Sequence, residues 1–295
     1  MQPIFQRKMA IFKGKLRPYW QLIKSLQTGL LLTTGLAGYM SARCPVTNWT
    51  TVLGLSASLF LAISGSTVLN MWYDRDIDAR MQRTCQRPLP GGLVSTMEAL
   101  RLGLVLSAAG GGWALALDRL YGLVVLAGLF LDVGIYTIWL KRRTPWSIVW
   151  GGVSGGIPIL AGRALGIGGI DWIGALLALA VLFWIPTHIM TFSMRYFDDY
   201  RSAGVPTFPA VYGFQTTRLV IALSSLAAAL SIGFALVGIG MTWGYLRLLA
   251  VLSAGLLLLA VISLARPSER VVFGLFKYAS LYMLSSMMLL ILAVL

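Results

Sequence analysis

Charged residues are scarce in this sequence. Only 12% of its 295 residues are Asp, Glu, Lys or Arg, whereas 58% are hydrophobic, and the mean hydropathy is +0.79. A water-soluble domain usually carries about 25% charged residues, so this chain lacks the groups needed to solvate a globular surface. The composition excludes a soluble domain and indicates an integral membrane protein.

Acids, cysteine and histidine are also few, with ten Asp and Glu, two Cys and one His. The net charge of +14 is that of many nucleic-acid-binding proteins, but Lys and Arg stand between apolar runs rather than along one face, which argues against that class. The predicted topology places Cys44 and Cys85 on opposite sides of the membrane, which excludes a disulfide framework. The basic first 17 residues lack an apolar core, so we expect no cleavable signal peptide; a short organellar transit peptide is the alternative.

Apolar runs long enough to span a bilayer, about 20 residues each, occur nine times. We therefore expect one all-α transmembrane domain over residues 1–295, with a basic N-terminal segment at 1–18. The expected spans are 20–41, 51–70, 97–117, 120–140, 146–167, 170–193, 217–238, 243–264 and 272–294.

The distribution of basic residues predicts the orientation. In this topology all but four of the 24 Lys and Arg residues fall on one side; the four exceptions are Arg43, Arg119, Arg163 and Arg247. The positive-inside rule makes the basic side cytoplasmic. We therefore expect a cytoplasmic N-terminus, an external C-terminus and a plasma-membrane protein.

The acidic residues form two clusters, each at the cytoplasmic end of an expected helix. In the first, Asn70, Asp74 and Asp78 recur every four residues, which places three oxygen-bearing side chains on one helical face. Carboxylates so close repel one another unless a cation lies between them, and Mg²⁺ is the usual hard cation shared with a phosphate ligand. The sequence therefore predicts a magnesium and diphosphate site, although juxtamembrane charges in solvated loops are the simpler alternative.

The second cluster contains Asp198 and Asp199 between Arg195 and Arg201, about 120 residues later. Its position at the end of the sixth span mirrors the first cluster at the end of the second, which suggests a weak internal repeat. Arginines accompany both clusters, and guanidinium groups bind phosphate oxygens that a metal leaves exposed.

These motifs resemble those of the intramembrane, UbiA-type prenyltransferases. Asn70, Asp74 and Asp78, followed by Arg83-Thr84 and the run 87–91, are similar to the first signature of that family, and Asp198-Asp199 falls at its second acidic motif. The segments 136–145 and 200–213 are most similar to the heme O synthase branch. The sequence departs from that branch where Pro186-Thr187-His188 replaces a Pro-His-Phe-Trp motif and where Ser25 and Leu26 follow Lys24.

The resemblance implies nine helices around a central cavity, cytoplasmic loops over its polar mouth, and Mg²⁺-dependent transfer of a farnesyl group from its diphosphate to heme B. It implies one Mg²⁺ on Asn70, Asp74 and Asp78, and a second on Asp198, with Asp199 as a further ligand. The residues it implies for the diphosphate are Lys24, Arg83, Arg87, Lys141 and Arg195. His188 is expected to hold the porphyrin as an iron ligand, or to hydrogen-bond to a neighbouring helix.

An allylic cation requires aromatic faces and exclusion of water. The candidates, which are also typical of an interfacial aromatic belt, are Trp72, Tyr73, Tyr136, Trp139 and Trp184. We expect Asp76 to pair with Arg80 or Arg83, and Asp132 with Arg163.

Two alternatives remain open from the sequence. The first is prenyl transfer to another acceptor: a quinone-precursor ring, a chlorophyllide or a glycerophospholipid precursor. The second is a transporter, but transport sites lie near the membrane midplane, and the clustered acids lie at the cytoplasmic interface.

Overall fold

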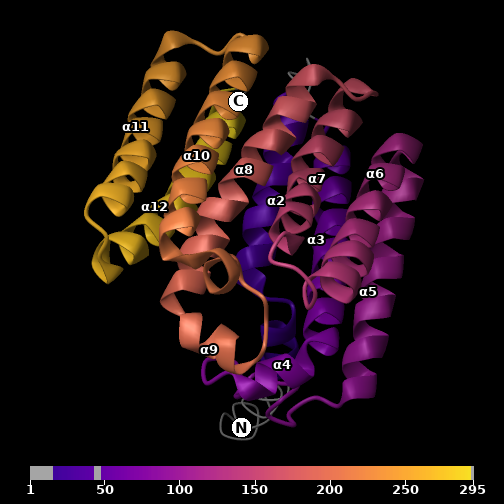
Figure 1. Ribbon diagram of the computed structural model, residues 1–295. Helices are drawn as coiled ribbons and strands as arrows, with labels where there is room; N and C mark the ends of the chain where they lie inside the picture. Colours follow the sequence, from indigo (N-terminus) through magenta and orange to yellow (C-terminus); the bar gives the residue numbers. More distant parts are fainter. Residues whose placement is uncertain (1–15, 43–47, 294–295) are drawn as a thin grey trace, which may run out of the picture.

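The described part of the chain, residues 16–42 and 48–293 of a computed structural model, is a bundle of helices without strands (Figure 1). Its elements are α2 (Ser25–Met40), α3 (Trp49–Tyr73), α4 (Arg75–Arg80), α5 (Thr96–Leu117), α6 (Arg119–Leu129), the π-helix η1 (Phe130–Leu140), α7 (Ser147–Ile167), α8 (Trp172–Arg195), α9 (Phe197–Ser202), α10 (Phe208–Ile239), α11 (Trp243–Ala265) and α12 (Glu269–Leu292).

Eight helices of the described part are long and apolar enough to cross a membrane, with α6 and η1 counted as the single span Arg119–Leu140. They correspond to the last eight spans expected from the sequence. The first expected span, 20–41, is interrupted: residues 16–22 are helical, and α2, with 16 residues, starts only after Lys24. Lys24 adopts a left-handed backbone with φ of 43°, a conformation that ends a helix and that non-glycine residues rarely adopt.

Short polar signals set where several helices begin. Asn48, Ser95, Asp118, Asp171 and Ser268 each accept a hydrogen bond from a backbone N–H group of the first turn that follows. Such N-caps satisfy amide groups that lipid cannot hydrate. The short helices α4 and α9 lie together at one end of the bundle, where the two acidic clusters are found (Figure 1).

Small residues allow the central helices to approach closely, as in other membrane bundles. A Cβ atom added to Gly162 of α7 would lie 1.9 Å from the carbonyl oxygen of Gly35 in α2, and one added to Gly38 would lie 2.0 Å from that of Ile159. The α2–α7 contact is therefore backbone against backbone, and α7 packs in turn on α8.

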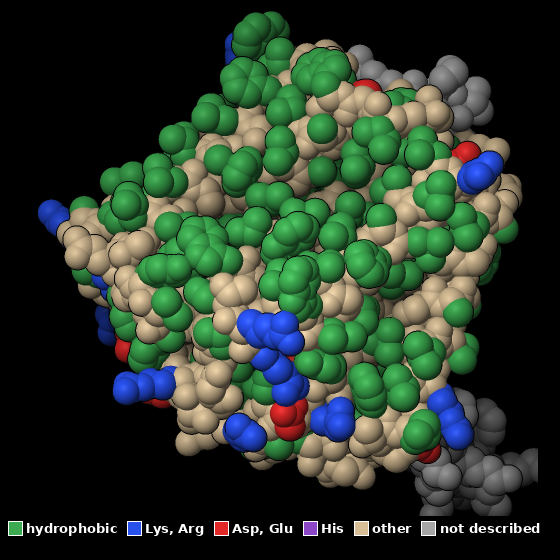
Figure 2. Space-filling view, turned by 45° about the vertical axis from the view of Figure 1, so that its right-hand side comes forward, with side chains coloured by type: hydrophobic (Ala, Val, Ile, Leu, Met, Phe, Trp, Pro, Cys, Tyr) green, Lys and Arg blue, Asp and Glu red, His purple; other side chains and the backbone are tan. Residues whose placement is uncertain are grey.

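The outer surface is that expected for contact with lipid. Hydrophobic side chains cover most of the face in Figure 2, and most of its Lys and Arg lie toward the lower end. Large apolar residues such as Leu53, Phe130 and Val251 are more than 60% exposed. This surface would be unfavourable in water and suits a bilayer.

The two intramembrane charges do not pair with each other, so that prediction was wrong. Asp132 on η1 accepts hydrogen bonds from Ser66 of α3 and Ser154 of α7. Arg163 binds Asp171 through two hydrogen bonds of 2.6 and 2.8 Å and also reaches Ser41. Each group is satisfied by neighbours at its own depth in the bundle. Cys44 and residues 1–15 of the basic segment 1–18 lie outside the described residues; Cys85 is a free thiol.

The α2–α7 contact predicts that Gly162→Ala destabilises the protein, because the new methyl group must push two backbones apart. We expect the thermal unfolding midpoint of the detergent-solubilised protein to fall by at least about 4 °C. Gly233→Ala in α10 is the matched control, since a Cβ atom at Gly233 would meet nothing within 4 Å. Equal midpoints for the two variants would contradict the close contact.

Candidate functional site

The first acidic cluster lies where α3 ends and α4 begins. Asp74 is the C-cap of α3 and Asp78 lies within α4, and the two residues are only 3% and 5% exposed. A carboxylate buried in an apolar bundle is strongly disfavoured unless cations or hydrogen-bond donors surround it. The identity of those partners therefore decides what this site can do.

Each buried carboxylate has a cation supplied by a different loop. Arg87 Nη1 donates to both oxygens of Asp78, at 2.9 and 2.7 Å, and Lys141 Nζ donates to Asp74. Asn70 donates from Nδ2 to the Thr137 hydroxyl at 2.8 Å, which leaves its amide oxygen as an acceptor. The cluster thus joins α3 to the 81–95 segment and to the end of η1.

Asp76 pairs with Arg142 rather than with Arg80 or Arg83, so the expected partners were wrong. Arg142 donates to both of its oxygens, at 2.6 and 2.8 Å, and also to the Tyr73 carbonyl. The Arg142 hydrogen bond holds the pKa of the Asp76 carboxyl below its usual value. Asp76 thus ties α4 to the loop after η1, and the same guanidinium lies 3.8 Å from Oδ1 of Asp74.

Beside the buried carboxylates is an open hollow of about 240 Å³ with three cationic side chains. Its lining consists of Gln21, Lys24, Met71, Arg83, Gln86, Arg87 and Pro88. The left-handed turn at Lys24 places this residue between the helical residues 16–22 and α2. The hollow therefore has the charge that an anionic group requires.

The side chain of Asp199 in the second acidic cluster contacts the backbone of the segment that follows the first cluster. Asp199 accepts hydrogen bonds from the backbone N–H groups of Gln82 and Arg83, at 3.2 and 3.3 Å. Apolar residues complete the contact; they are Ile77, Met81, Tyr200, Ala203 and Val205. Asp198 is exposed and has no ion pair among the described residues.

Arg83 and Arg195, both expected at the diphosphate, have different surroundings. The guanidinium of Arg83 lines the hollow and lies over the rings of Phe192 and Tyr196, 4.8 and 5.2 Å from their centroids. Arg195 lies 4.2 Å from the ring centroid of Phe273 on α12, away from the lining of the hollow. Only Arg83 therefore joins Lys24 and Arg87.

Of the aromatic candidates, Tyr73 and Tyr136 both contact cations of the charged cluster, and the guanidinium of Arg142 lies 4.5 Å from the Tyr73 ring centroid. Lys141 Nζ is 5.6 Å from the Tyr136 ring centroid, and the Tyr136 ring packs on Gly151, where a Cβ atom would come within 3.3 Å. Tyr136 belongs to η1, and π-helical turns are frequent at functional sites. Trp139 is 51% exposed, as in an interfacial belt, and Trp184 is buried with its Nε1 donating to the Ala279 carbonyl.

His188 lies deeper, on the face of α8 that packs against α12. Its ring stacks between Trp184 and Phe276, with centroid distances of 4.9 and 4.5 Å, and its Nδ1 is 3.2 Å from the hydroxyl of Ser280. The expected hydrogen bond to a neighbouring helix is therefore present. It leaves Nε2 as the ring nitrogen for an external partner.

The described residues contain no group of three His, Cys, Asp or Glu side chains arranged to hold a metal ion. The donor set nevertheless suits Mg²⁺ shared with a ligand: Asp74 Oδ1 is buried without a hydrogen-bond partner, and the amide oxygen of Asn70 is on the same helical face. Hard cations of this kind take only one or two protein carboxylates when phosphate oxygens complete the coordination.

Sequence reasoning missed three residues that organise the site. Thr84, fully buried, donates to the Asp78 carbonyl at 2.8 Å; Thr137 orients Asn70; and Arg142 holds Asp76. Thr84 belongs to the first family signature, and Thr137 and Arg142 belong to the segment 136–145, but the motifs assigned none of the three a role. The pairing of Thr137 with Asn70 depends on how η1 packs on α3.

The backbone contacts of Asp199 predict that Asp199→Ala frees the segment around Gln82. We expect the amide hydrogens of Gln82 and Arg83 to exchange with deuterium about tenfold faster, because a charged acceptor is lost. Hydrogen-exchange mass spectrometry of the 79–87 region measures this. Asp198→Ala, one residue away and exposed, is the control; equal acceleration in both variants would refute the role of Asp199.

Two proteins of the same name are similar to this chain in sequence over most of its length. The protoheme IX farnesyltransferase of Pyrobaculum islandicum is 36% identical over 266 residues, which cover 90% of this chain and 95% of that protein. The protein of the same name from Archaeoglobus fulgidus is 41% identical over 228 residues, covering 74% and 80%.

Solved structures share the fold. A digeranylgeranylglyceryl phosphate synthase matches 95% of this chain and 99% of its own, with a TM-score of 0.78 and 18% identity. A UbiA homologue from Archaeoglobus fulgidus bound to GPP and Mg²⁺ matches 93% and 99%, with a TM-score of 0.69 and 15% identity. The model of the UbiA prenyltransferase family matches residues 31–293. From these matches and the helical bundle, this chain belongs to the UbiA prenyltransferase family.

Proposed function

We propose that this prenyltransferase joins the farnesyl group of farnesyl diphosphate to one vinyl carbon of heme B while water adds to the other vinyl carbon, giving heme O and diphosphate. The observation that carries the proposal is the pair of buried carboxylates, Asp74 and Asp78, beside a cationic hollow at one end of an apolar bundle. An allylic diphosphate requires a charged head site next to apolar walls. The names of the relatives at 36% and 41% identity favour farnesyl and heme as the two substrates.

In this proposal Asn70, Asp74 and Asp78 hold one Mg²⁺ and Asp198 a second, with Asp199 positioning the helix that carries Asp198. When bound, the metal neutralises negative charge on the diphosphate oxygens. A UbiA homologue solved with Mg²⁺ and GPP supports the use of this ion.

The cations around the site bind the leaving diphosphate. Lys24, Arg83 and Arg87 line the hollow, and Lys141, which binds Asp74, is close enough to Lys24 to interact with it electrostatically. Lys141 and Arg87 bind the two carboxylates. They also donate to the diphosphate, where charge accumulates as the C–O bond breaks.

The allylic cation left by this cleavage faces the Tyr136 ring, which stabilises it by about 1–2 kcal/mol in a desolvated site. The apolar interior of the bundle keeps water away from it. His188 then holds the heme through Nε2, with Nδ1 oriented by Ser280.

For the topology, we propose nine membrane passages, with α2 and the helical residues 16–22 together making the first. The N-terminus is cytoplasmic, the C-terminus external, and the site faces the cytoplasm of a plasma-membrane protein, under loops 81–95 and 141–146. The excess of Lys and Arg at the α4 and α9 end supports this orientation.

Asp74→Ala is expected to reduce heme O formation at least about 100-fold, because both a metal ligand and the partner of Lys141 are lost. The measurement is chromatography of heme extracted from membranes that express each variant. Asp76→Asn is the matched control: Asp76 is half-exposed and binds only the loop residue Arg142, so activity should fall by no more than a few-fold. Full activity of Asp74→Ala would overturn the proposal.

Removal of divalent cations with EDTA should abolish transfer by purified protein, and Mg²⁺ should restore it. Transfer that persists without any divalent ion would remove the metal role of Asp74 and Asp78.

The identity of the acceptor is tested separately. If farnesyl diphosphate is consumed only with an aromatic acid or a lipid precursor as acceptor, the acceptor assignment is wrong while the prenyltransferase site stands.

A further inference from the structure

Aromatic side chains form a continuous column between α8 and α12. Four aromatic residues recur every four positions and so share one face: Trp184, His188 and Phe192 of α8, and Tyr196 at its C-cap. Phe276 of α12 stacks on His188 and contacts Phe192, with centroid distances of 4.5 and 5.4 Å. With Phe273, which is nearly parallel to Phe276 at 8°, these six residues are called the aromatic ladder.

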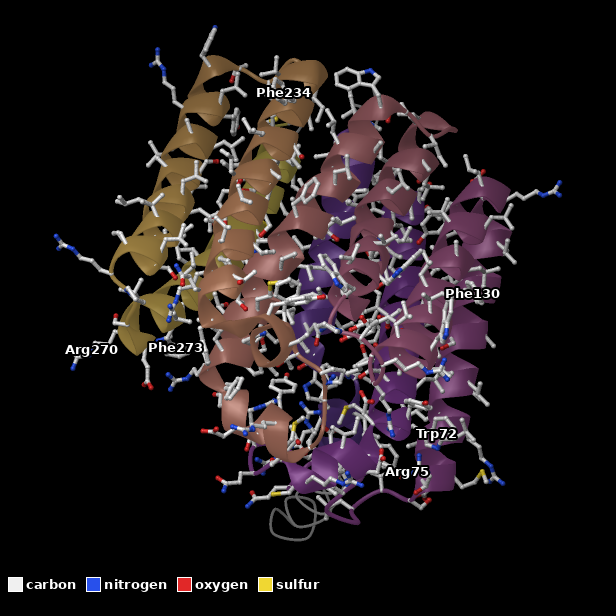
Figure 3. The ribbon with its side chains drawn as sticks, in the orientation of Figure 1. Trp72, Arg75, Phe130, Phe234, Arg270 and Phe273 are labelled. Atoms are coloured by element: carbon white, nitrogen blue, oxygen red, sulfur yellow. The ribbon has the colours of Figure 1, made fainter. Side chains whose placement is uncertain are left out.

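Two cations stand at the end of the aromatic ladder nearest the acidic clusters. The guanidinium of Arg195 lies 4.2 Å, and the ammonium of Lys277 4.5 Å, from the ring centroid of Phe273. Both side chains are exposed, and neither forms an ion pair with a carboxylate anywhere in residues 16–42 and 48–293. Figure 3 places Phe273 near the lower end of α12, beside Arg270.

The aromatic ladder also adjoins the cationic hollow. Arg83 is shared, since its guanidinium lines the hollow and covers the rings of Phe192 and Tyr196. A molecule lying on the ladder would therefore be next to the place proposed for the farnesyl diphosphate. Adjacency of this kind is what an acceptor needs in order to meet the allylic carbon.

The rings are partly accessible rather than sealed in the core. His188, Phe192, Phe273 and Phe276 are all half-buried, whereas Trp184 at the deep end is 5% exposed and anchored by its hydrogen bond to Ala279. The ladder thus has an anchored deep end and partly accessible rings between that end and the two cations.

We propose that the aromatic ladder is the binding surface for the heme acceptor, with Arg195 and Lys277 binding its two propionates. The inference rests on the proposed function and identifies the part of the bundle that binds its acceptor. A porphyrin is a flat apolar ring system with two carboxylates on one edge, so it needs an apolar surface, here the edges of the stacked rings, and two cations at one end.

The spacing along α8 agrees with this chemistry. His188 and Arg195 are seven residues apart, so they lie on the same face and about 10 Å apart along the helix axis. That separation is of the order of the distance from the centre of a porphyrin to its propionates. His188 Nε2 can thus face the iron while Arg195 and Lys277 reach the carboxylates. Arg195 therefore serves the acceptor rather than the diphosphate.

The test compares hemin with hemin dimethyl ester, in which both propionates are uncharged. Binding of each to the purified full-length protein in detergent is followed by the Soret absorbance. Arg195→Gln combined with Lys277→Gln should weaken hemin binding about tenfold and leave ester binding unchanged. Arg270→Gln removes a positive charge from the same end of α12 without touching the ladder, and should change neither.

A second variant tests the rings themselves. Phe276→Leu should weaken hemin and ester binding alike, by about fivefold, with an unfolding midpoint close to that of the unmodified protein. If the double variant binds hemin as the unmodified protein does while heme O is still made, Arg195 and Lys277 do not bind the propionates and this inference fails. If the unmodified protein makes no heme O and binds no hemin, the proposed function itself fails.

Discussion

Two carboxylates buried at the end of an apolar bundle constrain the rest of this structure. Asp74 and Asp78 are almost inaccessible to solvent, and an uncompensated charge there costs several kcal/mol. The compensation comes from Arg87 and Lys141, on two separate loops, so both loops must close over the end of α3. The charges that satisfy these carboxylates are also the ones an anionic substrate would require.

Irregular backbone accumulates around this point. The helical residues 16–22 and α2 are separated by the left-handed Lys24, the span that carries Tyr136 ends as a π-helix, and α10 is kinked at Gly213. In lipid, such departures are tolerated only where protein or a cavity covers the freed backbone groups. These irregular segments lie toward the end of the bundle that carries the acidic clusters, where departures from regular helix position polar side chains.

Arg83 connects the two parts of the proposed site. Its guanidinium lines the hollow with Lys24 and Arg87 and also covers rings of the aromatic ladder. Its backbone N–H donates to Asp199 of α9. Donor and acceptor would therefore be held against the same short segment. This gives the second acidic motif a structural role that is independent of metal binding.

The membrane class, eight of the spans and the gathering of acids at one end follow from the sequence alone, because apolar run length and four-residue spacing are local properties. The partners of the charges were decided only by tertiary structure. Asp132 meets Ser66 and Ser154, and Arg163 meets Asp171, because side chains pair with whatever neighbouring helices present at the same depth. The break at Lys24 likewise interrupts an apolar run that the sequence predicts as one helix, because hydropathy does not depend on the backbone conformation of a single residue.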